Sequence, residues 1–130
     1  MRKLRLLVCG GRDYNFHSRI YHALNDVLDL YGPFSCIITG DCPTGADHWA
    51  ESWAWMEKLR HLKFAADWIG YGRAAGPIRN QIMFDEGKPD IGLAFPGGKG
   101  TTSMIKIMKA GGMKPIKKST PFEGRLFGFT

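Results

Sequence analysis

The chain has 130 residues, of which 44% are hydrophobic and 23% charged, as in an ordinary globular domain with its own core. Its cysteines and histidines lack metal-ligand spacing, and no apolar stretch could span a membrane, so we expect no metal, no cofactor and no membrane partner. We also expect a cytosolic protein of a bacterial or phage-infected cell, because no secretory signal precedes the first apolar run. The net charge of +6 favours anionic partners, or reflects a solvated lysine face.

Apolar runs that suit buried strands alternate with helical patterns in the first half of the chain. Leu4 to Cys9 predicts a strand, and apolar residues at helical spacing from Ile20 to Tyr31 predict the helix after it. Ser35 to Thr39 predicts the second strand. The apolar face from Ala46 to Ala54 predicts the second helix.

The third unit has a longer connection than the others. Leu62 to Ala66 predicts a strand, and residues 67–76 a loop with several glycines. Pro77 suits the first turn of the next helix. Ile78 and Ile82 are expected on the buried side of that helix.

The last units complete the alternation. Asp90 to Phe95 predicts the fourth strand, Thr101 to Ala110 the fourth helix, and Pro115-Ile116 a short last strand. The inward side chains of that helix are expected to be Met104, Ile105 and Met108. The pattern predicts one Rossmann-like, doubly wound α/β domain over residues 1–118, with about five mostly parallel strands and helices on both faces. Residues 119–130 are expected to form a tail.

Loops that follow parallel strands meet at one edge of the sheet, where ligands bind. The first such loop contains Gly10 and Gly11, which let the backbone approach a ligand closely. Arg12 is suited to clamping a phosphate, and Asp13 to accepting from a ribose hydroxyl or capping the next helix. A plain turn remains the alternative.

The second and third loops carry further candidates. Gly45 keeps the next helix entrance small, and Asp47 either complements the helix dipole or orients a ligand hydroxyl. Arg79 and Asn80 are expected in the first turn of a helix, where a positive side chain opposes the dipole and so suggests a bound anion. Trp68 is suited to stacking on a base or to packing in the core.

The fourth loop, Pro96 to Thr102, gives the strongest phosphate signal. Three glycines, two threonines and a helix start form a cradle of N–H groups, hydroxyls and dipole. It is not a Walker loop, because Lys99 precedes the last glycine, and no strand ends in G-x-G-x-x-G.

These motifs occur in one order along the chain. They are Gly10-Gly11-Arg12-Asp13-Tyr14, Gly45-Ala46-Asp47, Ala66-Asp67-Trp68, Ala75-Gly76-Pro77 with Arg79-Asn80, and Ala94-Phe95-Pro96-Gly97-Gly98-Lys99-Gly100-Thr101. Together they resemble the YspA-type branch of the SLOG superfamily, whose Rossmann-like members include the LOG phosphoribohydrolases and the DprA-type DNA-processing proteins. The resemblance implies a nucleotide-related ligand over the fourth loop.

The resemblance also bears on catalysis. LOG enzymes cleave the N-glycosidic bond of nucleoside monophosphates with an arginine, matched here by Arg79, and a glutamate whose position holds Met104. A thioether cannot stabilise the oxocarbenium character that develops on the sugar. LOG-type hydrolysis would therefore need Asp13, Asp47 or Asp85 as a substitute.

We therefore predict a sensor or binding protein for a phosphorylated nucleotide or nucleotide derivative. The candidate ligand-binding residues are Gly10, Gly11, Arg12, Asp13, Gly45, Asp47, Trp68, Arg79, Asn80, Pro96, Gly97, Gly98, Lys99, Gly100, Thr101 and Thr102. One alternative is a nucleotide N-glycosidase with Arg79, Asp13 and Asp47 as catalytic residues, and another is DprA-like binding of single-stranded DNA. The apolar surface of Trp49, Trp53 and Trp55 suggests a homodimer.

Overall fold

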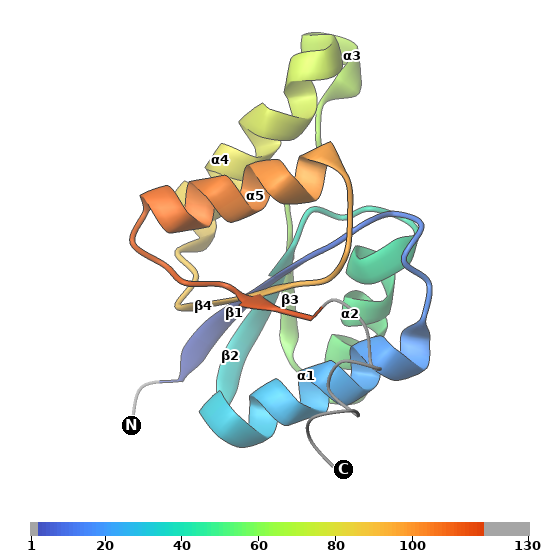
Figure 1. Cartoon of the computed structure of the whole chain (residues 1–130), viewed down its shortest axis with the longest axis vertical. Helices are drawn as coiled ribbons and strands as arrows, with labels where there is room; N and C mark the ends of the chain where they lie inside the picture. The colour runs from blue at the N-terminus through green and yellow to red at the C-terminus, as the bar shows by residue number, and fades with distance from the viewer. Residues whose placement is uncertain (1–2, 119–130) are drawn as a thin grey trace.

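The computed structural model describes residues 3–118, which form a five-stranded parallel sheet between two layers of helices (Figure 1). The strands are β1 (Leu4–Cys9), β2 (Phe34–Thr39), β3 (Arg60–Lys63), β4 (Ile91–Ala94) and β5 (Ile116–Lys117). Their order in the sheet is β3-β2-β1-β4-β5, and every pair is parallel. The predicted Rossmann-like α/β fold is confirmed.

Two pairs of helices cover the two faces of the sheet. α1 (His17–Tyr31) and α2 (Gly45–Met56) pack together on one face, and α4 (Ala75–Gly87) and α5 (Lys99–Ala110) on the other. A single-turn helix, α3 (Trp68–Tyr71), and a 3-10 turn, Gly72–Ala74, precede α4 and project from one end of the molecule (Figure 1).

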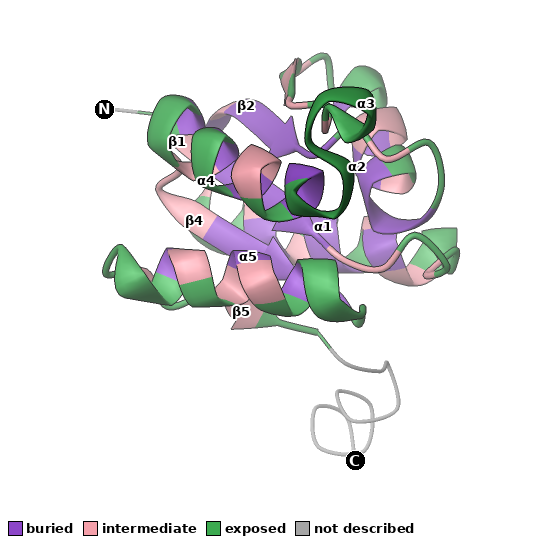
Figure 2. Cartoon of the chain, turned by 90° about the horizontal axis from the view of Figure 1, so that it is seen from above, coloured by how far each residue is buried: buried purple, intermediate pink, exposed green. Residues whose placement is uncertain are grey.

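Each face of the sheet has its own apolar core. Leu6 and Val8 of β1 point into the core under α1 and α2, and Leu7 and Cys9 into the core under α4 and α5. Successive residues of a strand point to opposite faces, so a central strand with two covered faces needs a continuous apolar run. The buried centre of the sheet is visible from above in Figure 2.

The third strand lies two residues earlier than predicted. Arg60 pairs with Cys36 and Lys63 with Thr39 of β2, which makes β3 an edge strand. Arg60 and Lys63 are exposed, which an edge position permits, and the predicted Leu62 to Ala66 run therefore extends into the following loop. An apolar run identifies central strands better than edge strands.

The helix after β3 also differs from its prediction. α4 begins at Ala75, two residues before Pro77, and Ile82 is 41% exposed rather than buried. The inward face carries small and polar residues beside Met83, namely Gly76, Asn80 and Gly87. Of the two isoleucines predicted on the buried side, Ile78 is half-buried, and the prediction is wrong for Ile82. The predicted loop over residues 67–76 is also wrong in part, because Asp67 caps α3 by accepting from the Gly70 N–H at 2.9 Å.

The tryptophans of α2 differ in exposure. Trp53 is buried with its indole N–H donating to Asn25 Oδ1 at 2.9 Å, whereas Trp55 is 80% exposed. The expected homodimer stays a prediction. Within residues 3–118 no helix is long and apolar enough to span a membrane, and the expected tail at 119–130 lies outside the described residues.

Candidate functional site

The site lies where the direction of the sheet's connections reverses. β1 and β4 are neighbours, but β1 leads to α1 on one face and β4 to α5 on the other. The loops after these two strands therefore diverge and leave a crevice, the usual ligand position in open α/β sheets. The Gly11 N–H donates to the Pro96 carbonyl at 2.8 Å and joins the two loops at its base.

The crevice is a cavity of about 550 Å³, within the usual range of about 300–1,000 Å³ for small-molecule sites. Its walls come from the first and fourth loops, the start of the β2–α2 loop, and α4. The structure brings the first and fourth loops to one cavity, and thirteen of the sixteen candidate residues line it: Gly10, Gly11, Arg12, Asp13, Asp47, Arg79, Asn80, Pro96, Gly97, Gly98, Lys99, Gly100 and Thr101.

The other three candidates lie outside the cavity. Gly45 (φ 72°) packs behind the first loop, where a Cβ would collide with the Gly11 carbonyl oxygen. Thr102 faces a second groove along α5, and its hydroxyl donates to the Gly98 carbonyl at 3.1 Å. Trp68 is 51% exposed on α3. α3 follows the edge strand β3, two strands away from β1.

The fourth loop presents bare backbone to the cavity. A Cβ at Gly98 or Gly100 would meet no atom within 4 Å. Gly98 is the N-cap of α5, and the helix start has no side-chain capping bond. The first amides of a helix have no partner within it and carry the positive end of its dipole. This wall of the cavity is therefore suited to an anion.

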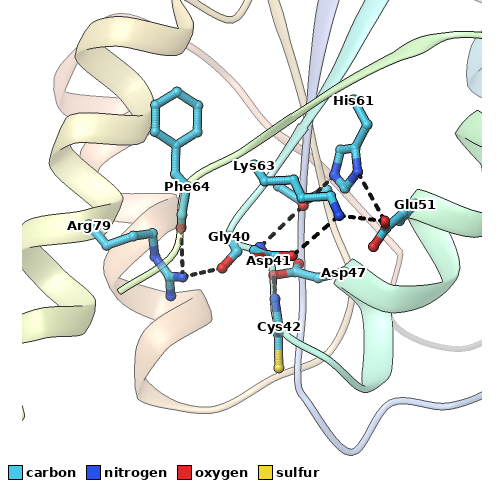
Figure 3. A network of polar contacts seen from close by, with 10 residues as sticks. Gly40, Asp41, Cys42, Asp47, Glu51, His61, Lys63, Phe64 and Arg79 are labelled. Carbon is cyan, nitrogen blue, oxygen red and sulfur yellow. Dashed lines mark hydrogen bonds and ion pairs between the residues drawn. The ribbon is translucent and has the colours of Figure 1, made fainter. Parts of the chain in front are cut away.

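Arg79 and Asn80 lie in the second turn of α4, so their predicted first-turn position is wrong. Arg79 Nη1 donates to the carbonyls of Gly40 at 2.5 Å and Phe64 at 3.3 Å (Figure 3). Its Nε donates to Asn80 Oδ1 at 2.8 Å. Asn80 Nδ2 donates to the Gly100 carbonyl at 3.2 Å. Both side chains line the cavity while joining α4 to the loops after β2, β3 and β4.

Asp47 is the buried acid of the site, with 8% of its surface exposed. It lies in the first turn of α2, but Thr44 is the N-cap, and Asp47 Oδ2 accepts from the Cys42 N–H at 3.2 Å (Figure 3). Burial raises the pKa of Asp47 to about 6, against the opposing effects of the Cys42 amide and the Arg79 charge. Close to neutral pH this carboxyl can therefore exist in either protonation state.

Sulfur and apolar groups form the floor of the cavity. Cys9, Met83 and Met104 line it together with Val8, and Met104 is fully buried. Burial, with the nearby charge of Asp47, raises the pKa of Cys9 to about 12, so the thiol is neutral. Within residues 3–118 no group of three or more His, Cys, Asp or Glu side chains could hold a metal ion.

The two remaining candidate acids differ in position. Asp13 is exposed at the rim of the cavity and does not cap α1, whose N-cap is Phe16 without a side-chain bond. Asp85 lies on the exposed face of α4, outside the cavity lining, and accepts from Gln81 Nε2 at 3.0 Å. Asp47 and Asp13 are therefore the candidate acids that reach the site.

Sequence reasoning did not place several lining residues in the site. Gly40 and Cys42 follow β2, and Tyr14 stacks on Phe95 with ring centroids 5.6 Å apart. The rule that loops after parallel strands share an edge could have found these three. Met83 gave no such signal, because the inward face of its helix was assigned wrongly.

Comparisons with known proteins agree with the motifs. A sequence model of the YspA, cpYpsA-related SLOG family matches residues 4–71, which run from β1 to α3. The "Gene 61 protein" of Mycobacterium phage D29 is 31% identical over 115 residues, which cover 82% of this chain and 90% of that protein. No solved structure matches the chain.

Proposed function

The chain belongs to the YspA, cpYpsA-related SLOG family, and from that premise we propose that its cavity binds a phosphorylated nucleotide or nucleotide derivative, as a sensor or binding protein. One observation carries the proposal. The start of α5 lines the cavity with two glycines, Gly98 and Gly100. A Cβ at either glycine would meet no atom within 4 Å, so their backbone is uncovered on that side. Exposed amides at a helix start bind phosphate without further groups.

The charges around the cavity support an anionic ligand. Arg12 and Lys99 are exposed at the rim, and Arg79 lies deeper. Exposed cations at a cavity mouth attract anions and form charge-assisted hydrogen bonds with phosphate oxygens. The apolar floor under them suits the uncharged part of such a ligand.

A thermal-shift screen of nucleoside mono-, di- and cyclic phosphates and ADP-ribose derivatives tests this function. A ligand that binds the native state raises the midpoint of unfolding, and at a given concentration a tighter ligand raises it more. Gly98→Asp and Gly100→Asp should each abolish the shift, because each adds negative charge where the phosphate is expected to bind, in space that is open.

The matched control is Leu30→Asp, which adds the same charge at an exposed position (74%) near the far end of α1. This variant should keep the full shift. Absence of a shift with every nucleotide, or equal shifts in folded Gly98→Asp, Gly100→Asp and the unmodified protein, would contradict the proposal.

Asp47 favours a second candidate function, a nucleotide N-glycosidase with a displaced acid. Its carboxyl is buried in the cavity with a pKa raised to about 6, the kind of perturbed group that acid–base chemistry uses. Ionised, it would stabilise the sugar cation; protonated, it would donate to the leaving base. Chromatographic detection of free base from nucleoside monophosphates, lost in Asp47→Asn, would support this function. If no free base is released above the uncatalysed background, the N-glycosidase function is contradicted and the binding function is the one that remains.

A further inference from the structure

Most polar side chains deep in the cavity already serve the protein. Arg79 uses Nε and Nη1 on Asn80 and on two backbone carbonyls, and the Asn80 amide accepts from Arg79 and donates to the Gly100 carbonyl. These hydrogen bonds hold both side chains in place and use most of their polar groups within the protein. The other buried polar side chains of the lining are Thr101 and Asp47, and of these two Asp47 has the ionisable group.

Asp47 has acceptor capacity beyond its protein contacts. Its Oδ2 accepts from the Cys42 amide, and the Gly40 amide also favours the ionised form. A carboxylate has about four acceptor sites, and burying its charge is unfavourable unless donors occupy them. A ligand with hydrogen-bond donors at this place would supply what the protein does not.

The topology indicates which part of a nucleotide reaches Asp47. Asp47 lines the cavity together with Cys9, the last residue of β1, and accepts from the Cys42 amide in the loop after β2. The cavity wall suited to an anion, at Gly98 and Gly100, follows β4. β4 is the neighbour of β1 on the side opposite β2, and adjacent strands lie about 4.8 Å apart. Asp47 and that wall line the same cavity, so a nucleotide with its phosphate on the wall has room to direct its ribose hydroxyls, the first donors along it, towards Asp47.

We propose that Asp47 recognises the ribose of the bound nucleotide by accepting hydrogen bonds from its 2′- and 3′-hydroxyls, which makes the site selective for ribonucleotides. This inference rests on the nucleotide-binding function proposed above. Selectivity follows because a deoxyribose leaves part of a buried carboxylate without a donor, and sites built to bind a hydroxyl reject ligands that lack it. The groups that face Asp47 from neighbouring elements are Cys9, Arg79 and Asp41.

Isothermal titration with AMP, GMP, CMP and UMP and their 2′-deoxy forms tests the proposal without any substitution. The unmodified protein should bind the ribonucleotide at least about tenfold more tightly than its deoxy form, the effect of one lost charge-assisted hydrogen bond. In Asp47→Asn the ratio should fall to within about threefold. The affinity for inorganic pyrophosphate, which has no ribose, should stay unchanged.

Asp29→Asn is the control, because it removes an exposed acid of α1 that does not line the cavity, and it should keep the ribose preference. Equal binding of ribo and deoxy forms would overturn the inference and leave nucleotide binding standing. A preference that follows the base and not the sugar, and that Asp47→Asn removes, would overturn it too by assigning Asp47 to the base. Failure of every nucleotide to bind would overturn both proposals.

Discussion

The cavity has a packed wall towards α2 and an open wall at the start of α5, and both are rich in glycine. On the packed wall, a Cβ at Gly10 would lie 2.6 Å from Ala46 Cβ. Behind this wall, a Cβ at Gly45 would collide with the Gly11 carbonyl oxygen. On the open wall, a Cβ at Gly98 or Gly100 would meet nothing within 4 Å. The same residue type thus allows close packing on one side and exposes backbone on the other.

We therefore expect the packed glycines at this edge of the sheet to affect stability, and the open glycines to affect ligand binding. A glycine that lets two loops approach each other fixes the shape of the cavity, so its replacement should affect the free energy of unfolding. A glycine in open space has no such role in the unliganded protein. Its replacement should affect what the cavity binds.

The largest expected effect is that of Gly45→Ala, directly behind the packed wall. Gly45 has a φ of 72°, a conformation that is unfavourable for alanine, and the added methyl would overlap the backbone of the first loop. Strain and overpacking together should lower the free energy of unfolding by about 4 kcal/mol, measured by urea denaturation.

Gly100→Ala is the matched change on the open wall. Gly100 lies within α5, where alanine is the better helix former, so this variant should be equally stable or more stable by up to about 1 kcal/mol. Similar destabilisation by the two changes would remove the distinction between the walls.

Asp47→Asn should stabilise the unliganded protein at alkaline pH, by up to about 3 kcal/mol. The pKa of Asp47 is raised from 3.8 to about 6, and each unit corresponds to about 1.4 kcal/mol. A raised pKa means that the folded protein binds the proton more tightly, so folding stability falls as pH rises from about 4 to 6 and stays lowered above that. Asparagine keeps an acceptor for the Cys42 amide and has no charge to bury.

Urea denaturation at pH 8 and pH 4 measures this effect. The stabilisation should be present at pH 8 and mostly lost at pH 4, where Asp47 is protonated in the folded protein and close to half protonated in the unfolded chain. Asp13→Asn, at the exposed rim, should change stability by less than about 0.5 kcal/mol at either pH. An Asp47→Asn variant that is less stable at pH 8 would show that the carboxylate holds the packed wall together.

The sequence predicted the centre of this fold better than its edge. β1 is buried on both faces, so its continuous apolar run marks its limits, and Leu4–Cys9 was predicted without error. β3 has one strand neighbour, and its exposed Arg60 and Lys63 gave no apolar signal. The buried face of α4 carries Gly76, Asn80 and Gly87 beside Ala75 and Met83, and hydrophobic periodicity does not detect glycine and asparagine.

For the candidate site, the first and fourth loops were brought together as expected, because residues after adjacent parallel strands share an edge. Which loops are adjacent depends on the order of the strands, and no local pattern encodes that order. Trp68 was therefore included although it follows the edge strand. The contacts of Arg79 depend on where α4 begins, which α3 and the 3-10 turn decide.

Arg79→Ala tests whether Arg79 serves stability, as the packed wall does, or ligand binding, as the open wall does. Arg79 lines the cavity, but it also donates hydrogen bonds to Asn80 and to two backbone carbonyls. We expect a loss of about 2 kcal/mol in the free energy of unfolding, since the Gly40 and Phe64 carbonyls lose a charged donor. Arg79→Lys should recover part of it by keeping the charge with one donor group. An Arg79→Ala variant with unchanged stability and weaker binding of phosphorylated ligands alone would instead mean that Arg79 serves binding, like the open wall.

The smallest expected effect is that of Trp68→Ala, because Trp68 lies on neither wall of the cavity. Trp68 is 51% exposed on α3 and follows the edge strand, whereas the cavity lies between the loops after β1 and β4. Base stacking on an aromatic side chain is worth about 1–3 kcal/mol, so a stacking role would weaken nucleotide binding at least about fivefold. We expect instead a change in the dissociation constant of less than about twofold, measured by titration with the nucleotide that gives the largest thermal shift. A fivefold or larger loss with unchanged folding would extend the site to the third loop, and would mean that α3 moves towards the cavity when ligand binds.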